Sequence, residues 1–150
     1  MTENSFEPRF TGYAEKVRNS FADQHYMAHI GARITNIRPG VVDIEVPAVS
    51  ELEQQHGFVH GGVTTAIADS AAGYAALSLY DEGDGILTVE LKINFLAPAD
   101  GEKLIARGQV IKPGRTLTVC RADVFSMAGG KEKLVATGMM TMACRPSLKH

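Results

Sequence analysis

The sequence predicts an α+β domain in which an antiparallel β-sheet wraps around a long central α-helix, with an additional helix at the N-terminus. Two observations lead to this prediction. Residues 60–80 are almost all small or apolar, with Asp69 as the one acidic or basic side chain besides His60, so their helix must be surrounded on most sides. Before and after it, segments of alternating apolar and polar residues are joined by short turns, which is typical of antiparallel strands.

The N-terminal part of the chain is expected to contain one helix and one hairpin. Apolar residues recur at near-helical spacing across residues 9–22, which indicates an amphipathic helix. Two alternating segments, 30–34 and 42–46, flank a Pro-Gly turn and predict a pair of strands. The polar, irregular segment 48–59 then leads into the central helix, where a second copy of the chain would cover the remaining face.

Four strands are expected after the central helix and the turn-forming residues 81–85. In the first, residues 89–95, the odd-numbered apolar residues share one face and the even-numbered polar residues share the other. The remaining strands are predicted over residues 105–111, 116–125 and 134–144, with turns at 112–115 and 129–131.

The composition is that of one globular domain over residues 1–150, of which residues 1–25 form a helical extension. Apolar residues make up 45% of the chain, charged residues 21%, and the formal net charge is -2, so we expect neither nucleic acid nor a membrane as partner. The chain has no secretory leader pattern and no run of about 20 apolar residues, which favours a cytoplasmic protein. Cys120 and Cys144 have no metal-type spacing and are interpreted as buried free thiols.

Asp69 is the most unusual residue of the central helix, because burying an ionised carboxylate is costly unless hydrogen bonds or a function offset it. Its neighbours at helical spacing, among them Thr65, Ala66 and Gly73, are small and leave open space above the carboxylate. We interpret Asp69 as the floor of a pocket. The alternative is a structural Asp that is hydrogen-bonded to a neighbouring strand or hydroxyl group.

Gly61 and Gly62 stand at the start of the same helix. A helix N-terminus offers free N–H donors, and glycine permits close approach of the backbone, so this end is suited to stabilising an oxyanion. The alternative is a tight turn that needs a positive φ. Because Gly61 and Asp69 are eight residues apart, about 12 Å of helix separates them. Both act on one carbonyl only if they come from two chains related by a two-fold axis.

Three stretches together resemble the hotdog-fold acyl-CoA thioesterases, specifically the PaaI-like branch of phenylacetic acid degradation. They are the segment from Gln54 through His60-Gly61-Gly62 to Asp69, the segment TVELKINFLAP at 88–98, and KPGRTL at 112–117. The resemblance covers about residues 30–145. It implies five or six antiparallel strands around a long helix, in agreement with the order above. It also implies dimers, paired into a dimer of dimers, with active sites at the dimer interface.

The resemblance implies a role for five residues in catalysis. Asp69 matches the catalytic carboxylate, which acts as a general base on water or as a nucleophile. The Gly61 N–H of the other subunit would hold the carbonyl oxygen, with His60 beside it. Gln54 and Thr88 match positions that orient the water or the thioester, although Thr88 shares its predicted face with the polar residues of its strand.

The resemblance further implies contacts with the acyl-CoA substrate from the start of the helix, the end of one strand and a turn: Gly62, Phe95, Leu96, Pro98, Lys112, Gly114, Arg115 and Thr116. Lys112 and Arg115 flank a Pro-Gly turn and are suited to binding phosphates, although basic residues in a hairpin turn are also commonly just solvated. No cofactor and no metal are implied, since coenzyme A is part of the substrate.

The favoured function is hydrolysis of a medium-chain or aromatic acyl-CoA to the free acid and CoA. Two alternatives stay open. One is a hotdog-fold 3-hydroxyacyl dehydratase or hydratase, in which His60 is the base. The other is a non-catalytic hotdog domain that binds acyl-CoA. Asp69 argues against the second, because binding an uncharged acyl group gains nothing from a buried carboxylate.

Overall fold

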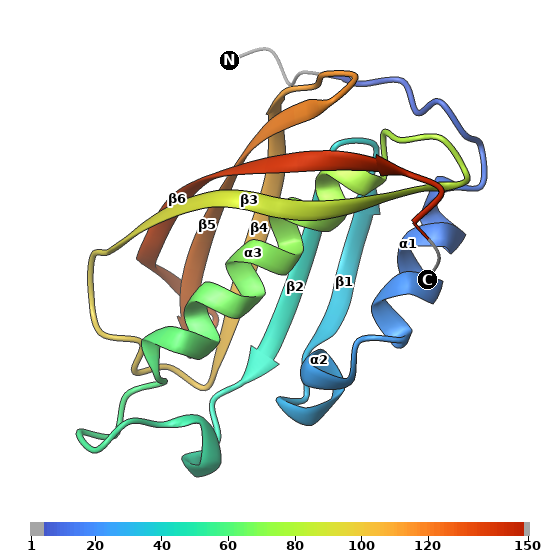
Figure 1. Ribbon diagram of the computed structural model, residues 1–150. Coiled ribbons are helices and arrows are strands. Elements are labelled where there is room, and N and C mark those ends of the chain that lie inside the picture. Colours follow the sequence, from blue (N-terminus) through green and yellow to red (C-terminus); the bar gives the residue numbers. More distant parts are fainter. Residues whose placement is uncertain (1–4, 149–150) are drawn as a thin grey trace.

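Six antiparallel strands form one sheet that curves around helix α3 in the computed structural model, which describes residues 5–148 (Figure 1). The first four residues of the predicted N-terminal extension lie outside this range. The elements in chain order are α1 (Tyr13–Ala22), α2 (His25–His29), β1 (Arg33–Arg38), β2 (Val41–Pro47), the short 3-10 helix η1 (Ser50–Leu52), α3 (Gly61–Leu77), β3 (Asp84–Phe95), β4 (Lys103–Lys112), β5 (Leu117–Ala128) and β6 (Lys131–Pro146).

The strand order in the sheet is β1-β2-β4-β5-β6-β3, so β1 and β3 are the two edge strands. Figure 1 shows α3 lying across the concave face, with α1 and α2 beside β1. Helix α3 contacts β2, β3, β4, β5 and β6, which confirms the predicted sheet wrapped around one helix. The core consists of the inward side chains of these strands and the apolar residues of α3.

The close fit of α3 against the sheet depends on small residues on both surfaces. Ala71, Ala72, Ala75 and Ala76 on the helix are completely buried. On the strand side, a Cβ atom added to Gly108 of β4 would lie 2.2 Å from the Ala71 carbonyl carbon, so the helix backbone rests directly on this glycine.

The two halves of α3 differ in burial, which refines the predicted surrounded helix. Every residue from Ala71 to Leu77 is buried, whereas the first ten residues keep one face open. This face carries Gly61, Gly62, Thr65, Ala66, Asp69 and Ser70. The sheet therefore covers the C-terminal half of α3 fully and leaves an open stripe along the N-terminal half.

The predicted boundaries differ from the structure at several places; helix α1 begins at Tyr13 instead of residue 9, and β6 begins at Lys131 instead of residue 134. Helix α3 ends at Leu77 instead of residue 80. The hydroxyl of Ser78, which follows it, donates to the Ala75 carbonyl and accepts from the Gly40 N–H at 2.8 Å. These bonds hold the end of the helix against the β1–β2 turn. Strand β3 begins at Asp84, inside the expected turn. Residues 25–29 form a short helix that the prediction missed, so β1 begins after Ile30 rather than at it.

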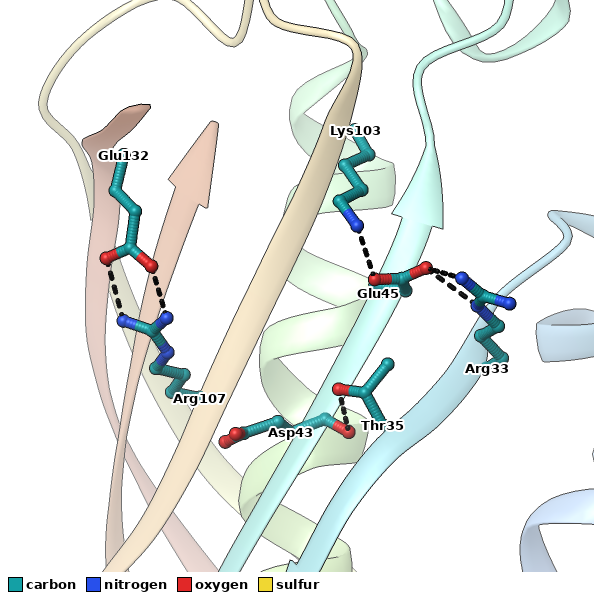
Figure 2. Close-up of polar contacts among 7 residues, drawn as sticks. All are labelled: Arg33, Thr35, Asp43, Glu45, Lys103, Arg107 and Glu132. Atoms are coloured by element: carbon teal, nitrogen blue, oxygen red, sulfur yellow. Dashed lines mark hydrogen bonds and ion pairs between the residues drawn. The ribbon is translucent and has the colours of Figure 1, made fainter. Parts of the chain in front are cut away.

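Charged side chains cover the outer face of the sheet and pair there (Figure 2). Glu45 is 8% exposed and accepts from Arg33 Nε at 2.7 Å and Lys103 Nζ at 3.0 Å. Burial alone would raise the pKa of Glu45, but these hydrogen bonds outweigh it and hold the pKa below its usual value. Arg107 forms a two-pronged ion pair with Glu132.

The contact between Gly108 and α3 leads to a prediction for stability. Gly108→Ala forces the added methyl group into the helix backbone, which has no free space to move into, so the free energy of unfolding should fall by about 3 kcal/mol. Gly83→Ala is the matched control, because nothing lies within 4 Å of its Cβ position. Urea denaturation of both variants measures the difference, and equal stability would contradict the inferred close contact.

Candidate active site

His60 is the N-cap residue of α3, and its Nδ1 accepts a hydrogen bond from the Gly62 N–H at 2.8 Å. Because Nδ1 is the acceptor, the neutral imidazole carries its proton on Nε2. The Gly61 N–H has no acceptor within residues 5–148. One backbone donor at the positive end of the helix is thus left for a ligand.

Neither glycine of this pair has a positive φ, so the tight-turn interpretation of Gly61 and Gly62 is wrong. What both positions require is space. A Cβ on Gly61 would lie 3.2 Å from the Phe95 ring, and a Cβ on Gly62 would lie 2.9 Å from His60 Nδ1. The absence of side chains lets the Phe95 ring and the imidazole approach the helix backbone closely.

Asp69 lies on the open face of α3, two turns beyond the glycines. Its Oδ1 accepts a hydrogen bond from the Thr88 hydroxyl of β3 at 2.8 Å. Burial raises the pKa of Asp69, and the Thr88 hydrogen bond partly offsets this rise. A carboxylate with a raised pKa and a fixed position is a stronger base than an exposed one.

Thr88 faces the helix, not the outer face on which the alternating pattern predicted it. The cause is a β-bulge between β3 and β6: Thr88 pairs with Met142 and Glu90 with Thr141, so Val89 is an extra residue. The extra residue reverses the alternation. Thr88 before the bulge and Leu91 after it therefore both lie opposite buried residues of β6, namely Met142 and Met140.

Four of the five predicted catalytic residues line two separate pockets of the same chain, and His60 lines neither. A pocket of about 400 Å³ is lined by Gln54, Gly61, Phe95, Leu96 and Pro98. A second pocket of about 460 Å³ is lined by Asp69, Thr88 and residues of both α3 and the N-terminal segment. Each pocket thus contains only some of the predicted catalytic residues, as the separation of Gly61 and Asp69 along the helix requires.

Gln54 belongs to the loop that precedes α3. Its backbone N–H donates to the Phe58 carbonyl at 2.8 Å, and its side-chain oxygen accepts from the His56 N–H. These bonds hold the amide side chain at the rim of the pocket that contains Gly61. The loop therefore presents Gln54 in a fixed orientation.

The two predicted groups of CoA contacts lie at opposite ends of the sheet. Phe95 pairs with Ala136 at the end where β6 begins, whereas Lys112 pairs with Val119 at the end where β5 begins. The ten residues of β4 that separate these ends span about 30 Å. Residues 95–98 and 112–116 of one chain are therefore too far apart to contact the same part of a ligand.

Among the residues that line the Asp69 pocket and were not predicted as site residues, three come from the N-terminal segment: Ser20, Asp23 and Gln24. They belong to the N-terminal segment, which the sequence identified only as a helical extension. Its amphipathic pattern predicts that it packs on the domain, and no local signal indicates which pocket its polar side chains reach.

Other features do not add to this site. A larger cavity of about 560 Å³ lies on the outer face of the sheet, where Arg107 is paired with Glu132 and Arg121 with Asp123. Within residues 5–148, no group of three His, Cys, Asp or Glu side chains is arranged to hold a metal ion. Cys120 and Cys144 are free and buried, as predicted. No helix within the described range is long and apolar enough to span a membrane.

Residues 56–133 match the thioesterase superfamily. The human acyl-coenzyme A thioesterase 13 is 30% identical over 109 residues, which is 72% of this chain and 76% of that protein.

Two solved structures resemble the fold. A thioesterase family protein from Silicibacter pomeroyi is 49% identical, with a TM-score of 0.88 over 90% of this chain and 99% of that chain. The E. coli PaaI protein of the phenylacetic acid degradation operon is 20% identical, with a TM-score of 0.81 over 90% and 94% of the two chains, which is a likeness of fold. These matches confirm the predicted hotdog fold.

The Asp69–Thr88 hydrogen bond leads to a prediction for titration. A hydroxyl that donates to the ionised carboxylate lowers its pKa, so Thr88→Val should raise the pKa of Asp69 further. The measurement is a ¹³C NMR titration of the Asp69 carboxyl group. Thr65→Val is the control, because the Thr65 hydroxyl bonds the Gly61 carbonyl instead. An unchanged pKa in Thr88→Val would contradict the assigned hydrogen bond.

Proposed function

The chain belongs to the thioesterase superfamily, and from this premise we propose that it hydrolyses a medium-chain or aromatic acyl-CoA to the free acid and CoA. The observation that carries the proposal is the Asp69 carboxylate on the open face of α3, with a raised pKa and a hydrogen bond from Thr88. A plain binding site for an acyl group has no use for a carboxylate that is costly to bury.

Asp69 begins the reaction in either of two ways. As a general base it removes a proton from water, whose oxygen attacks the thioester carbon. As a nucleophile it attacks that carbon directly, and water then hydrolyses the resulting anhydride. In both routes the C–S bond breaks and CoA leaves as a thiolate that takes up a proton. Coenzyme A is part of the substrate, and no other cofactor takes part in this scheme.

The oxyanion formed by the attack needs a donor that Asp69's own chain cannot supply. Gly61 lies about 12 Å along the helix from Asp69, whereas reacting groups must lie about 3 Å apart. We assign this role to the Gly61 N–H of a partner subunit, with His60 beside it and Gln54 at the rim. Each dimer then contains two sites, and each site uses one half of either chain.

The edge strand β3 is the surface on which this dimer would form. Leu87, Val89, Leu91 and Phe95 are between 40% and 57% exposed along it. A sheet edge with a row of exposed apolar side chains is prone to pairing with another strand. Antiparallel pairing of two β3 strands would place the start of one α3 beside the middle of the other. A further pairing of dimers into tetramers is part of the same proposal.

The CoA portion of the substrate would be held by residues of both subunits. Gly62, Phe95, Leu96 and Pro98 surround the end of α3 at which the oxyanion donor lies. The turn with Lys112, Gly114, Arg115 and Thr116 lies at the far end of the sheet, so we assign it to the phosphates of a CoA bound between chains. Two cations that flank one turn suit that role.

The hydrogen bond of His60 favours hydrolysis over the dehydratase alternative. A histidine that acts as base needs an unprotonated nitrogen directed at the substrate. His60 Nδ1 already accepts from the Gly62 N–H, and Nε2 carries the proton, so the imidazole is arranged as a donor.

The roles of Asp69 and His60 predict different losses of activity. Asp69→Asn should abolish hydrolysis of acyl-CoA, whereas His60→Ala should only weaken it, because the histidine assists and does not attack. Rates on matched acyl-CoA and enoyl-CoA panels measure both effects. Loss of enoyl-CoA hydration in His60→Ala, without thioester hydrolysis in the unmodified protein, would support the dehydratase. Full activity of Asp69→Asn would refute both enzymes.

The role of the Gly61 N–H is tested with a matched pair of variants. Gly61→Pro removes the N–H at the first helical position, where proline is tolerated, and His60 has an extended backbone that accommodates a following proline. Gly61→Ala keeps the N–H and adds a similar Cβ against Phe95. The value of kcat should fall by about 10²- to 10³-fold in Gly61→Pro relative to Gly61→Ala.

Mixing two inactive chains tests the shared site directly. When Asp69→Asn and Gly61→Pro chains are refolded together, half of the dimers are mixed, and each mixed dimer has one intact site. Activity should therefore return to about a quarter of the unmodified level. If Asp69 and Gly61 of the same chain acted together, the mixture would stay inactive.

A further inference from the structure

Thr64 is a buried polar residue in the first turn of α3 that the proposed mechanism does not use. It is 2% exposed, and within residues 5–148 its hydroxyl has no hydrogen-bond partner. The neighbouring Thr65 differs, because its hydroxyl donates to the Gly61 carbonyl at 2.8 Å. A buried hydroxyl without a partner costs free energy, so Thr64 is suited to a partner from outside the chain.

The hydroxyl of Thr64 reaches the pocket that contains Gly61. Thr64 lines this pocket of about 400 Å³ together with Gln54 and Gly61. Within the described residues, every side-chain nitrogen or oxygen that is sealed from solvent has a partner, so the unpartnered Thr64 oxygen is an atom that stays accessible. Side chains on a helix lean towards its N-terminus, which directs this hydroxyl to the level of Gly61.

Most of the remaining lining of this pocket is apolar and includes Phe58, Leu96, Pro98 and Val135. A ligand that fits it is therefore largely hydrocarbon and carries a hydrogen-bonding group at the level of Thr64. A hydrocarbon acyl group has no such group beyond its carbonyl oxygen. The arm of CoA has one, because an amide N–H follows the thioester sulfur after two methylene groups.

The spacing of Gly61 and Thr64 along the helix matches the spacing of polar groups in that arm. When the Gly61 N–H binds the thioester carbonyl, four bonds separate the carbonyl carbon from the amide nitrogen, which is about 5 Å in an extended chain. Positions three residues apart on a helix lie about 5–6 Å from each other. One subunit thus presents both polar points in the order in which the thioester carries them.

We propose that Thr64 is a specificity-determining residue whose hydroxyl accepts a hydrogen bond from the amide N–H nearest the sulfur of the leaving thiol. The proposal rests on the proposed function for the position of the thioester carbonyl. It makes the site selective for thiols of the pantetheine type, independently of the acyl group. A thiol that lacks this amide leaves the Thr64 hydroxyl without a partner and is disfavoured.

The test uses hexanoyl thioesters of two short thiols, N-acetylcysteamine and 5-mercaptopentan-2-one, in which a methylene group replaces the amide N–H. The measured quantity is the ratio of kcat/KM for the amide to kcat/KM for the ketone. Thr64→Val replaces the hydroxyl with a methyl group and should lower this ratio about tenfold. Thr64→Ser keeps the hydroxyl and should preserve the ratio.

Thr141→Val is the matched control for the loss of a threonine hydroxyl. Thr141 lies in β6 between the buried Met140 and Met142, so its side chain is on the outer face of the sheet, away from the pocket. The ratio should be unchanged in this variant. Urea denaturation without ligand should show Thr64→Val to be at least as stable as the unmodified protein, because no bond within the chain is lost. A clear loss of stability would reveal a partner inside the chain and overturn the inference.

Binding measurements separate this inference from the proposed function. Calorimetric titration with hexanoyl-CoA should give a Kd about tenfold weaker for Asp69→Asn/Thr64→Val than for Asp69→Asn alone. Hydrolysis with an unchanged ratio and an unchanged Kd overturns the inference and leaves the thioesterase function intact. Absence of hydrolysis in the unmodified protein, with the loss of affinity retained, overturns the function alone. Absence of both hydrolysis and binding overturns both.

Discussion

Helix α3 lies so close to β4 that the strand has no room for a side chain at Gly108. This contact sets the depth at which the helix sits in the sheet, and the buried alanines of α3 are the complementary surface. A helix held at this depth keeps Gly61 and Asp69 in fixed positions relative to the sheet. It also leaves the first ten residues of the helix with one uncovered face, because the sheet curves around the other half. The position of the site thus follows from a packing contact that itself contains no reactive atom.

Two carboxylates show how the same fold treats charge in opposite ways. Glu45 on the outer face is buried but receives two cationic partners, so its pKa is lowered. It contributes stability above its ordinary pKa, and this contribution is lost as the pH falls through the lowered value. Within residues 5–148, Asp69 has no cationic partner and one hydroxyl donor, so burial raises its pKa and the hydrogen bond from Thr88 offsets the rise only in part. Asp69 therefore contributes to folding stability in acid, and this contribution is lost as the pH rises through its raised pKa. The ionised carboxylate that remains at neutral pH is costly for stability but is available as a base.

The helix-and-strand order was predictable because composition and alternation are local signals. A helix made of small side chains needs a surrounding sheet, and six alternating segments supply one. The bulge at Val89 was not predictable, because one extra residue in β3 is visible only against its partner β6. It reversed the expected orientation of Thr88. The role of the glycines was predictable only in part. Their position at the start of a helix was evident from the sequence, but the Phe95 ring that requires a glycine at position 61 comes from a strand 34 residues further along the chain. The reach of Gln24 into the Asp69 pocket depends entirely on how the N-terminal segment packs.

The distance between Gly61 and Asp69 has a consequence for how activity depends on assembly. Under the proposed arrangement, an isolated chain carries two incomplete sites and no complete one. Catalysis and association are then a single event, so specific activity is constant only while the protein is above its dimer dissociation constant and declines on further dilution. A newly synthesised chain would be inert towards thioesters until it finds a partner. The cell could therefore set the onset of hydrolysis through the amount of protein it makes, without any separate regulatory ligand.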